Sequence, residues 1–171
     1  MTELRIWHAA RDPYHCAFRM IRLLTWKHDK LPVAQLRLLD MLLMYPSLSL
    51  RMKLPSTVRD KLRALHLPPI KKLFISLPST ASIWQDLQLY QSTALKQLAG
   101  RSLLDRDALR DHYAALDSNQ LPILLLNRVH AENAAQAALM KFLMNDIATI
   151  SASGPDNIFK RAGVPVRGSF T

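Results

Sequence analysis

Apolar residues recur every three or four positions along most of the chain, which is the spacing of amphipathic α-helices. The first such segment, residues 13–26, has a predicted buried stripe that consists of Tyr14, Ala17, Phe18, Ile21 and Leu24. Asp12 and Pro13 precede this stripe and suit the N-cap and the first position of a helix. The segment also has a second, largely basic face, expected to point outward, that consists of His15, Arg19, Arg22 and Trp26.

Residues 32–45 are apolar on nearly every side in their second half, which predicts a helix at the centre of the core. Asp40 lies inside this run, and an isolated buried carboxylate would be too costly to keep charged. We therefore expect a core ion pair between Asp40 and an arginine: Arg37 on the same helix, or Arg19 or Arg22 on the first. A role as general base is disfavoured, because no nucleophile or second acid accompanies Asp40.

Further helical patterns follow over residues 82–100, 106–116 and 122–150, so the chain is predicted to be mainly α. The strand-like residues 100–105 leave open a winged-helix derivation with a short β wing. Three of the four glycines lie after residue 150. The sequence thus predicts a compact helical domain over residues 1–150 and a flexible basic tail over residues 151–171.

The net charge of +10 is unevenly distributed, and six of these charges fall between residues 51 and 72. This basic stretch contains Arg51, Lys53, Arg59, Lys61, Arg63, Lys71 and Lys72. A dense cationic segment suits phosphates of a nucleic acid or an acidic surface of a partner protein. A face that only meets solvent is the alternative.

Several classes of chemistry have no sequence signature here. The chain lacks a glycine-rich phosphate loop, a nucleophile elbow, a zinc-binding HExxH motif and paired cysteines. His8 and His15 have no evident third metal ligand, and no apolar run is long enough to span a membrane. The one cysteine, Cys16, fits a reducing compartment. We expect a cytoplasmic binding or assembly subunit without a cofactor or metal and without catalytic residues.

Two ordered motifs carry a family resemblance: "IWHAARDPYHCAFRMIRLL" and, shortly after it, "VAQLRLLDMLLMYPSL". The first includes Trp7, His8, Asp12, Pro13, Tyr14, His15, Phe18 and Arg19. The second includes Leu36, Arg37, Leu38, Leu39, Asp40, Tyr45 and Pro46. Together they resemble the middle component of bacterial ABC-three-component systems, particularly those of Lamassu-type anti-phage defence.

The resemblance implies a small non-catalytic subunit beside an SMC-like ATPase and an effector, often a nuclease. Such a subunit would link the ATPase heads to the effector in a complex that holds DNA without sequence preference. The competing hypothesis is a stand-alone winged-helix DNA-binding regulator, although no clear recognition helix is evident in the sequence.

Overall fold

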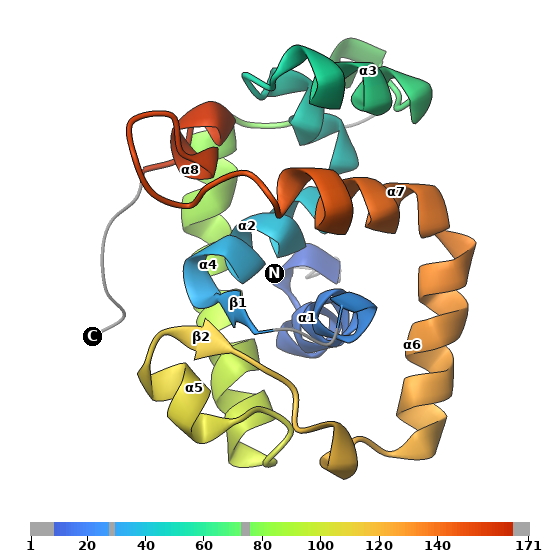
Figure 1. Cartoon of the computed structure of the whole chain (residues 1–171), viewed down its shortest axis with the longest axis vertical. Helices are drawn as coiled ribbons and strands as arrows, with labels where there is room; N and C mark the ends of the chain where they lie inside the picture. Colours follow the sequence, from blue (N-terminus) through green and yellow to red (C-terminus); the bar gives the residue numbers. More distant parts are fainter. Residues whose placement is uncertain (1–8, 28–29, 73–75, 166–171) are drawn as a thin grey trace, which may run out of the picture.

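The computed structural model describes residues 9–27, 30–72 and 76–165, and these are mainly helical, as the sequence predicts (Figure 1). The α-helices are α1 (Pro13–Lys27), α2 (Val33–Met44), α3 (Ser56–Ala64), α4 (Thr80–Gly100), α5 (Arg106–Arg110), α6 (Ile123–Ala135), α7 (Ala137–Lys141) and α8 (Ile158–Ala162). Short 3-10 helices are η1 (Ala9–Arg11), η2 (Pro46–Arg51), η3 (Ile70–Lys72) and η4 (Ser118–Gln120), and η5 (Phe142–Ile147) is a π-helix. Trp7 and His8 lie outside the described residues.

Helices α1 and α2 form the centre of the molecule, with α4 and α6 packed against α1. The predicted start of α1 is confirmed: the Asp12 side chain accepts a hydrogen bond from the Tyr14 amide at 2.8 Å, and Pro13 is the first helical residue. The apolar helix α2 is buried in the core, and its residues Leu36 and Leu39 are 0% exposed. The expectation of a central core helix is therefore confirmed.

A small antiparallel sheet joins β1 (Leu31–Pro32) to β2 (Tyr113–Ala114). Leu31 is opposite Ala114, and a single further bridge links Leu104 to Leu116. The paired segments are far apart in the sequence, so this sheet is not the β-hairpin that forms the wing of a winged helix. It fixes the chain before α2 against the chain after α5.

The packed core continues past residue 150, where the sequence analysis placed the start of a flexible tail. Helix α8 buries Ile158 and Phe159, and the ring of Phe159 meets that of Trp84 edge-to-face at 6.3 Å. The Asn157 side chain accepts a hydrogen bond from the Lys160 amide at 3.0 Å and caps the helix. Gly163 ends α8 with a left-handed φ of 70°. Residues 166–171 of the predicted tail lie outside the described part of the chain.

Two predictions for the surface of α1 are wrong. Tyr14 is 64% exposed rather than part of the buried stripe. Arg19 and Arg22 are buried, although the sequence analysis assigned them to an outward basic face. The reason is that α1 is central and is covered by α2, α4 and α6 on several sides, so little of its surface is left for solvent. Among the described residues, no helix has the length and apolar character needed to cross a membrane.

Candidate functional site

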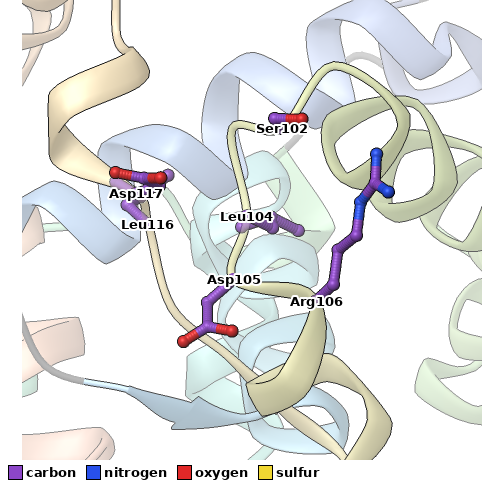
Figure 2. Close-up of a pocket in the computed structure, with 6 residues that line it drawn as sticks. All are labelled: Ser102, Leu104, Asp105, Arg106, Leu116 and Asp117. Atoms are coloured by element: carbon purple, nitrogen blue, oxygen red, sulfur yellow. The ribbon is translucent and has the colours of Figure 1, made fainter.

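An open pocket of about 490 Å³ lies where the Leu104–Leu116 bridge meets the start of α5. Its charged side chains, Asp105, Arg106 and Asp117, point in different directions and do not converge on one centre (Figure 2). The Asp105 carboxylate caps α5, since it accepts hydrogen bonds from the amides of residues 107 and 108. The Asp117 carboxylate accepts from the Asn119 amide at the start of η4. Both acids therefore have a local structural use.

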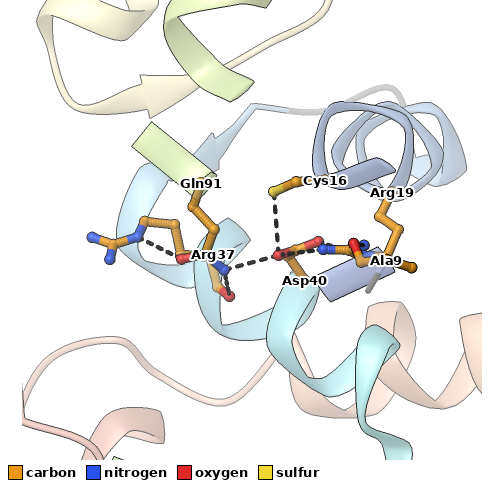
Figure 3. A network of polar contacts seen from close by, with 6 residues as sticks. All are labelled: Ala9, Cys16, Arg19, Arg37, Asp40 and Gln91. Atoms are coloured by element: carbon orange, nitrogen blue, oxygen red, sulfur yellow. Dashed lines mark hydrogen bonds and ion pairs between the residues drawn. The ribbon is translucent and has the colours of Figure 1, made fainter. Parts of the chain in front are cut away.

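A buried polar network surrounds Asp40 of α2, which is 0% exposed. Its Oδ1 accepts a hydrogen bond from Arg19 Nε of α1 at 2.7 Å, and its Oδ2 accepts from Arg19 Nη2 at 3.3 Å. Oδ2 also accepts from Gln91 Nε2 of α4 at 2.8 Å and from the Cys16 thiol at 3.5 Å. Figure 3 shows Asp40 between Arg19 on one side and Gln91 on the other. The predicted core ion pair is confirmed, with Arg19 as the partner among the three candidates.

Arg37 belongs to the same network through a different contact. Its Nε donates to Gln91 Oε1 at 2.9 Å, while Gln91 Nε2 donates back to the Arg37 carbonyl at 3.0 Å. The Arg37 guanidinium also lies over the Trp84 ring, 4.9 Å from its centroid. One amide side chain, Gln91, thus connects both charged groups of α2 to α4.

The electrostatics of this network favour a structural role. Burial alone would lower the pKa of Arg19, but the charge of Asp40 and the hydrogen bond to it raise that pKa overall. Burial, followed by the charge of Asp40, raises the pKa of the Cys16 thiol. Cys16 therefore stays protonated and donates to Asp40, and it is not the exposed, low-pKa thiolate that a nucleophile requires.

Arg22 has its own partners at the C-terminal end of α6 and directly after it. Its Nε donates to Asn133 Oδ1 at 2.9 Å, and Asn133 Nδ2 donates back to the Arg22 carbonyl at 3.0 Å. Its Nη2 donates to Gln136 Oε1 at 2.8 Å and to the Glu132 carbonyl at 3.3 Å. Burial lowers the pKa of Arg22. These bonds hold α6 against α1. Arg22, one of the three candidate partners of Asp40, bonds to these residues instead.

The basic stretch of residues 51–72 does not form one uniform face. Lys61 of α3 pairs with Asp146 of the π-helix η5, and Arg63 pairs with Asp60 at 3.0 Å. Arg51 is exposed, and its guanidinium donates to the carbonyls of residues 77 and 78. Two further cations of the stretch, Lys53 and Lys71, are exposed, and the side chain of Lys72 lies outside the described residues.

Helix α8 brings additional cations to one part of this stretch. The Arg161 guanidinium donates to the Lys53 carbonyl at 2.8 Å, and the Lys53 amide donates to the Arg161 carbonyl at 2.9 Å. Lys160, next along the helix, is exposed. The sequence analysis missed Arg161 and Lys160 as members of a surface because it assigned them to the tail. Asn157 and Gly163, which flank them, were the available signal for a short capped helix.

Two other polar residues of the site could have been found from their spacing. Gln91 lies four positions after buried Leu87, and Asn133 lies four positions after buried Val129. A polar residue at a buried helical position must find a hydrogen-bond partner. Among the described residues, no group of three His, Cys, Asp or Glu side chains could hold a metal ion.

Comparison with known protein families matches residues 5–165 to the family described as ABC-three component (ABC-3C) system Middle Component 5. The match extends from just before the first sequence motif to the end of the described residues. No curated protein and no solved structure matches the chain.

Proposed function

The chain belongs to the Middle Component 5 family of ABC-three component systems, and on that premise we propose that it is a non-catalytic assembly subunit. Membership makes it one component of a multi-subunit defence system, so it has protein partners. In the proposal these partners are an SMC-like ATPase and an effector, for which a nuclease is the preferred candidate. The subunit joins the two and controls release of the effector.

The observation that supports an assembly role most directly is the outward side of α6. Ile123 and Leu124 are 66% and 80% exposed, although both are large apolar side chains. Such groups at adjacent positions are expected to be covered by a partner subunit in the assembled complex. The buried charged residues Arg19, Arg22 and Asp40, by contrast, bond to other side chains inside the fold, which supports a scaffold role.

Co-expression with the ATPase encoded by a neighbouring gene tests this proposal. We expect the two proteins to co-purify, and Leu124→Asp to weaken the complex at least tenfold by placing a charge in the covered surface. Gln85→Asp places the same charge at an exposed position on α4, on the other side of α1 from α6 (Figure 1), and this control should retain the complex. A wild-type chain that stays monomeric and does not bind the ATPase would contradict the assembly role.

The finer features of the system are part of the same proposal. We assign it to anti-phage defence of the Lamassu type, acting in the cytoplasm on DNA held without sequence preference. Nucleotide hydrolysis and any DNA cleavage are assigned to the partners. The stand-alone winged-helix regulator is the less favoured function, because the small sheet joins distant segments and lacks the hairpin of a wing.

A further inference from the structure

We propose that Lys53, Arg59, Lys160 and Arg161 form a composite phosphate-binding surface for duplex nucleic acid. We call these four residues the α3–α8 cation cluster. The inference rests on the proposed function in one respect, since the cluster is where the assembled complex would contact the nucleic acid. The cluster differs from the basic stretch seen in the sequence, because half of its members come from α8 and several members of the stretch are outside it.

The cluster is organised around two consecutive backbone carbonyls. The Arg161 guanidinium donates to the carbonyl of residue 53 at 2.8 Å, and the Arg59 guanidinium donates to the carbonyl of residue 54 at 2.9 Å. Helices α3 and α8 lie at the same end of the molecule (Figure 1). Two arginines from distant parts of the sequence therefore bond to the backbone of the same short segment, which restricts their side chains and reduces the entropy lost when they bind an anion.

Both guanidiniums keep donors for a ligand. An arginine side chain has five N–H donors. Arg59 uses Nη2 for the carbonyl of residue 54, and Arg161 uses Nη1 for residue 53 and Nε for the Asp156 carbonyl at 2.9 Å. The remaining N–H groups can donate to phosphate oxygens, for which the planar guanidinium is well suited. The exposed ammonium groups of Lys53 and Lys160 add two further cations.

The distribution of acids separates this cluster from the rest of the basic stretch. Lys61 and Arg63 already have the carboxylates of Asp146 and Asp60 as partners. Within residues 9–27, 30–72 and 76–165, no carboxylate forms an ion pair with a member of the α3–α8 cation cluster. The positive charge of the cluster is thus less compensated than that of its neighbours on α3.

The surface chemistry favours phosphates over an acidic protein as the partner. Leu50, in η2 and three residues before Lys53, is 42% exposed, but none of the large apolar side chains exposed in the described chain comes from α3 or α8. Protein interfaces usually have apolar or aromatic anchors at their centre, whereas most contacts to duplex DNA go to phosphates and sugars through polar groups. Contacts of this kind position the duplex and carry no sequence preference.

The test measures binding of the co-purified complex to a labelled DNA duplex of mixed sequence over a range of KCl concentrations. Arg59→Gln combined with Arg161→Gln should lower the slope of log affinity against log salt by about 1.8, because each lost phosphate contact contributes about 0.9. Lys61→Gln combined with Arg63→Gln is the matched control, with the same charge removed from α3 positions that already have carboxylate partners. It should change the slope by less than half as much.

Arg161 also bonds to the backbone, so its replacement could disturb α8. Lys53→Gln combined with Lys160→Gln removes two exposed ammonium groups without touching those bonds, and we expect the same reduction in slope. Equal slopes for wild type, both cluster variants and the control would overturn the inference. A complex that dissociates in both cluster variants would show that the cluster docks an acidic protein, and would overturn it as well.

The inference and the proposed function fail in distinguishable ways. If the wild-type chain does not co-purify with the ATPase, the assembly role fails, and the same salt series is then run on the full chain alone. If the complex forms normally but the salt slope of its DNA binding is the same for wild type and the cluster variants, the assembly role is retained and the phosphate-binding surface is refuted.

Discussion

Replacing Asp40 with alanine is the sharpest test of the buried network. The substitution removes a carboxylate that accepts hydrogen bonds from Arg19, Gln91 and Cys16. The Arg19 side chain is only 9% exposed, so its guanidinium would remain buried without its counter-charge. Breaking a buried pair in this way costs about 3–5 kcal/mol.

The other donors change this figure little. Gln91 Nε2 keeps its bond to the Arg37 carbonyl, and a thiol is a weak donor, so the stranded cation dominates the loss. Because a single domain is stable by only about 5–15 kcal/mol, Asp40→Ala should forfeit a large part of the free energy of unfolding.

Urea unfolding followed by circular dichroism measures that free energy. Asp60→Ala is the control: Asp60 and Arg63 form an exposed pair, with side chains 70% and 71% exposed, and such pairs contribute at most about 1 kcal/mol. Arg19→Met combined with Asp40→Leu should recover part of the lost stability, because apolar residues can replace a buried ion pair.

An Asp40→Ala protein within about 1 kcal/mol of wild type would refute the reasoning that burial and pairing make this residue structural. A variant that is stable and fully folded, yet unable to support the assembled system, would identify Asp40 as a functional carboxylate instead.

Two further predictions address other buried groups. Asn133→Ala should reduce the free energy of unfolding by about 1–3 kcal/mol, because it leaves Arg22 Nε and the Arg22 carbonyl without this partner. The control is Asn127→Ala at an exposed position, which should change the free energy of unfolding little, and thermal unfolding compares the two variants. Burial and the charge of Asp40 raise the pKa of the Cys16 thiol, so on raising the pH the unfolded chain loses this proton before the folded chain does. The free energy of unfolding should therefore fall above the ordinary thiol pKa of about 9, by up to about 1.4 kcal/mol per pH unit. Cys16→Ala should lack this part of the slope in unfolding measured against pH, and an unchanged slope would contradict the assignment.

The sequence was most informative where the cost of burial constrains a residue. Asp40 lies in an apolar run, so its need for a cation followed from electrostatics alone. To identify Arg19 rather than Arg22 as the partner of Asp40, one must know which side of α1 faces α2 and which faces α6. The amphipathic pattern of one helix does not give this rotation about its axis. The same limit explains Tyr14, which has the spacing of a buried residue but is 64% exposed among the described residues.

The proposed phosphate-binding surface was predictable only in part, because sequence proximity is a poor guide to proximity on a surface. Lys61 and Arg63 lie close to Arg59 in the chain but have their own carboxylate partners. Arg161 is 108 positions away from Lys53, yet α8 places it beside Lys53. The glycine, serine and proline content around α8 resembles that of a linker, but the burial of Ile158, Phe159 and Ala162 outweighs that composition.

The reciprocal bonds between Arg22 and Asn133 have a consequence for how the protein acquires its structure during synthesis. The first half of α1 can meet α2 early, but the guanidinium of Arg22 has no such partner until the ribosome has released residue 133. Arg161 and Phe159 make their contacts later still. Contacts of such long sequence separation slow folding, because a long loop must close before they form. During synthesis, the Arg22 guanidinium of α1 and the ring of Trp84 on α4 therefore lack these contacts until α6 and α8 have been made.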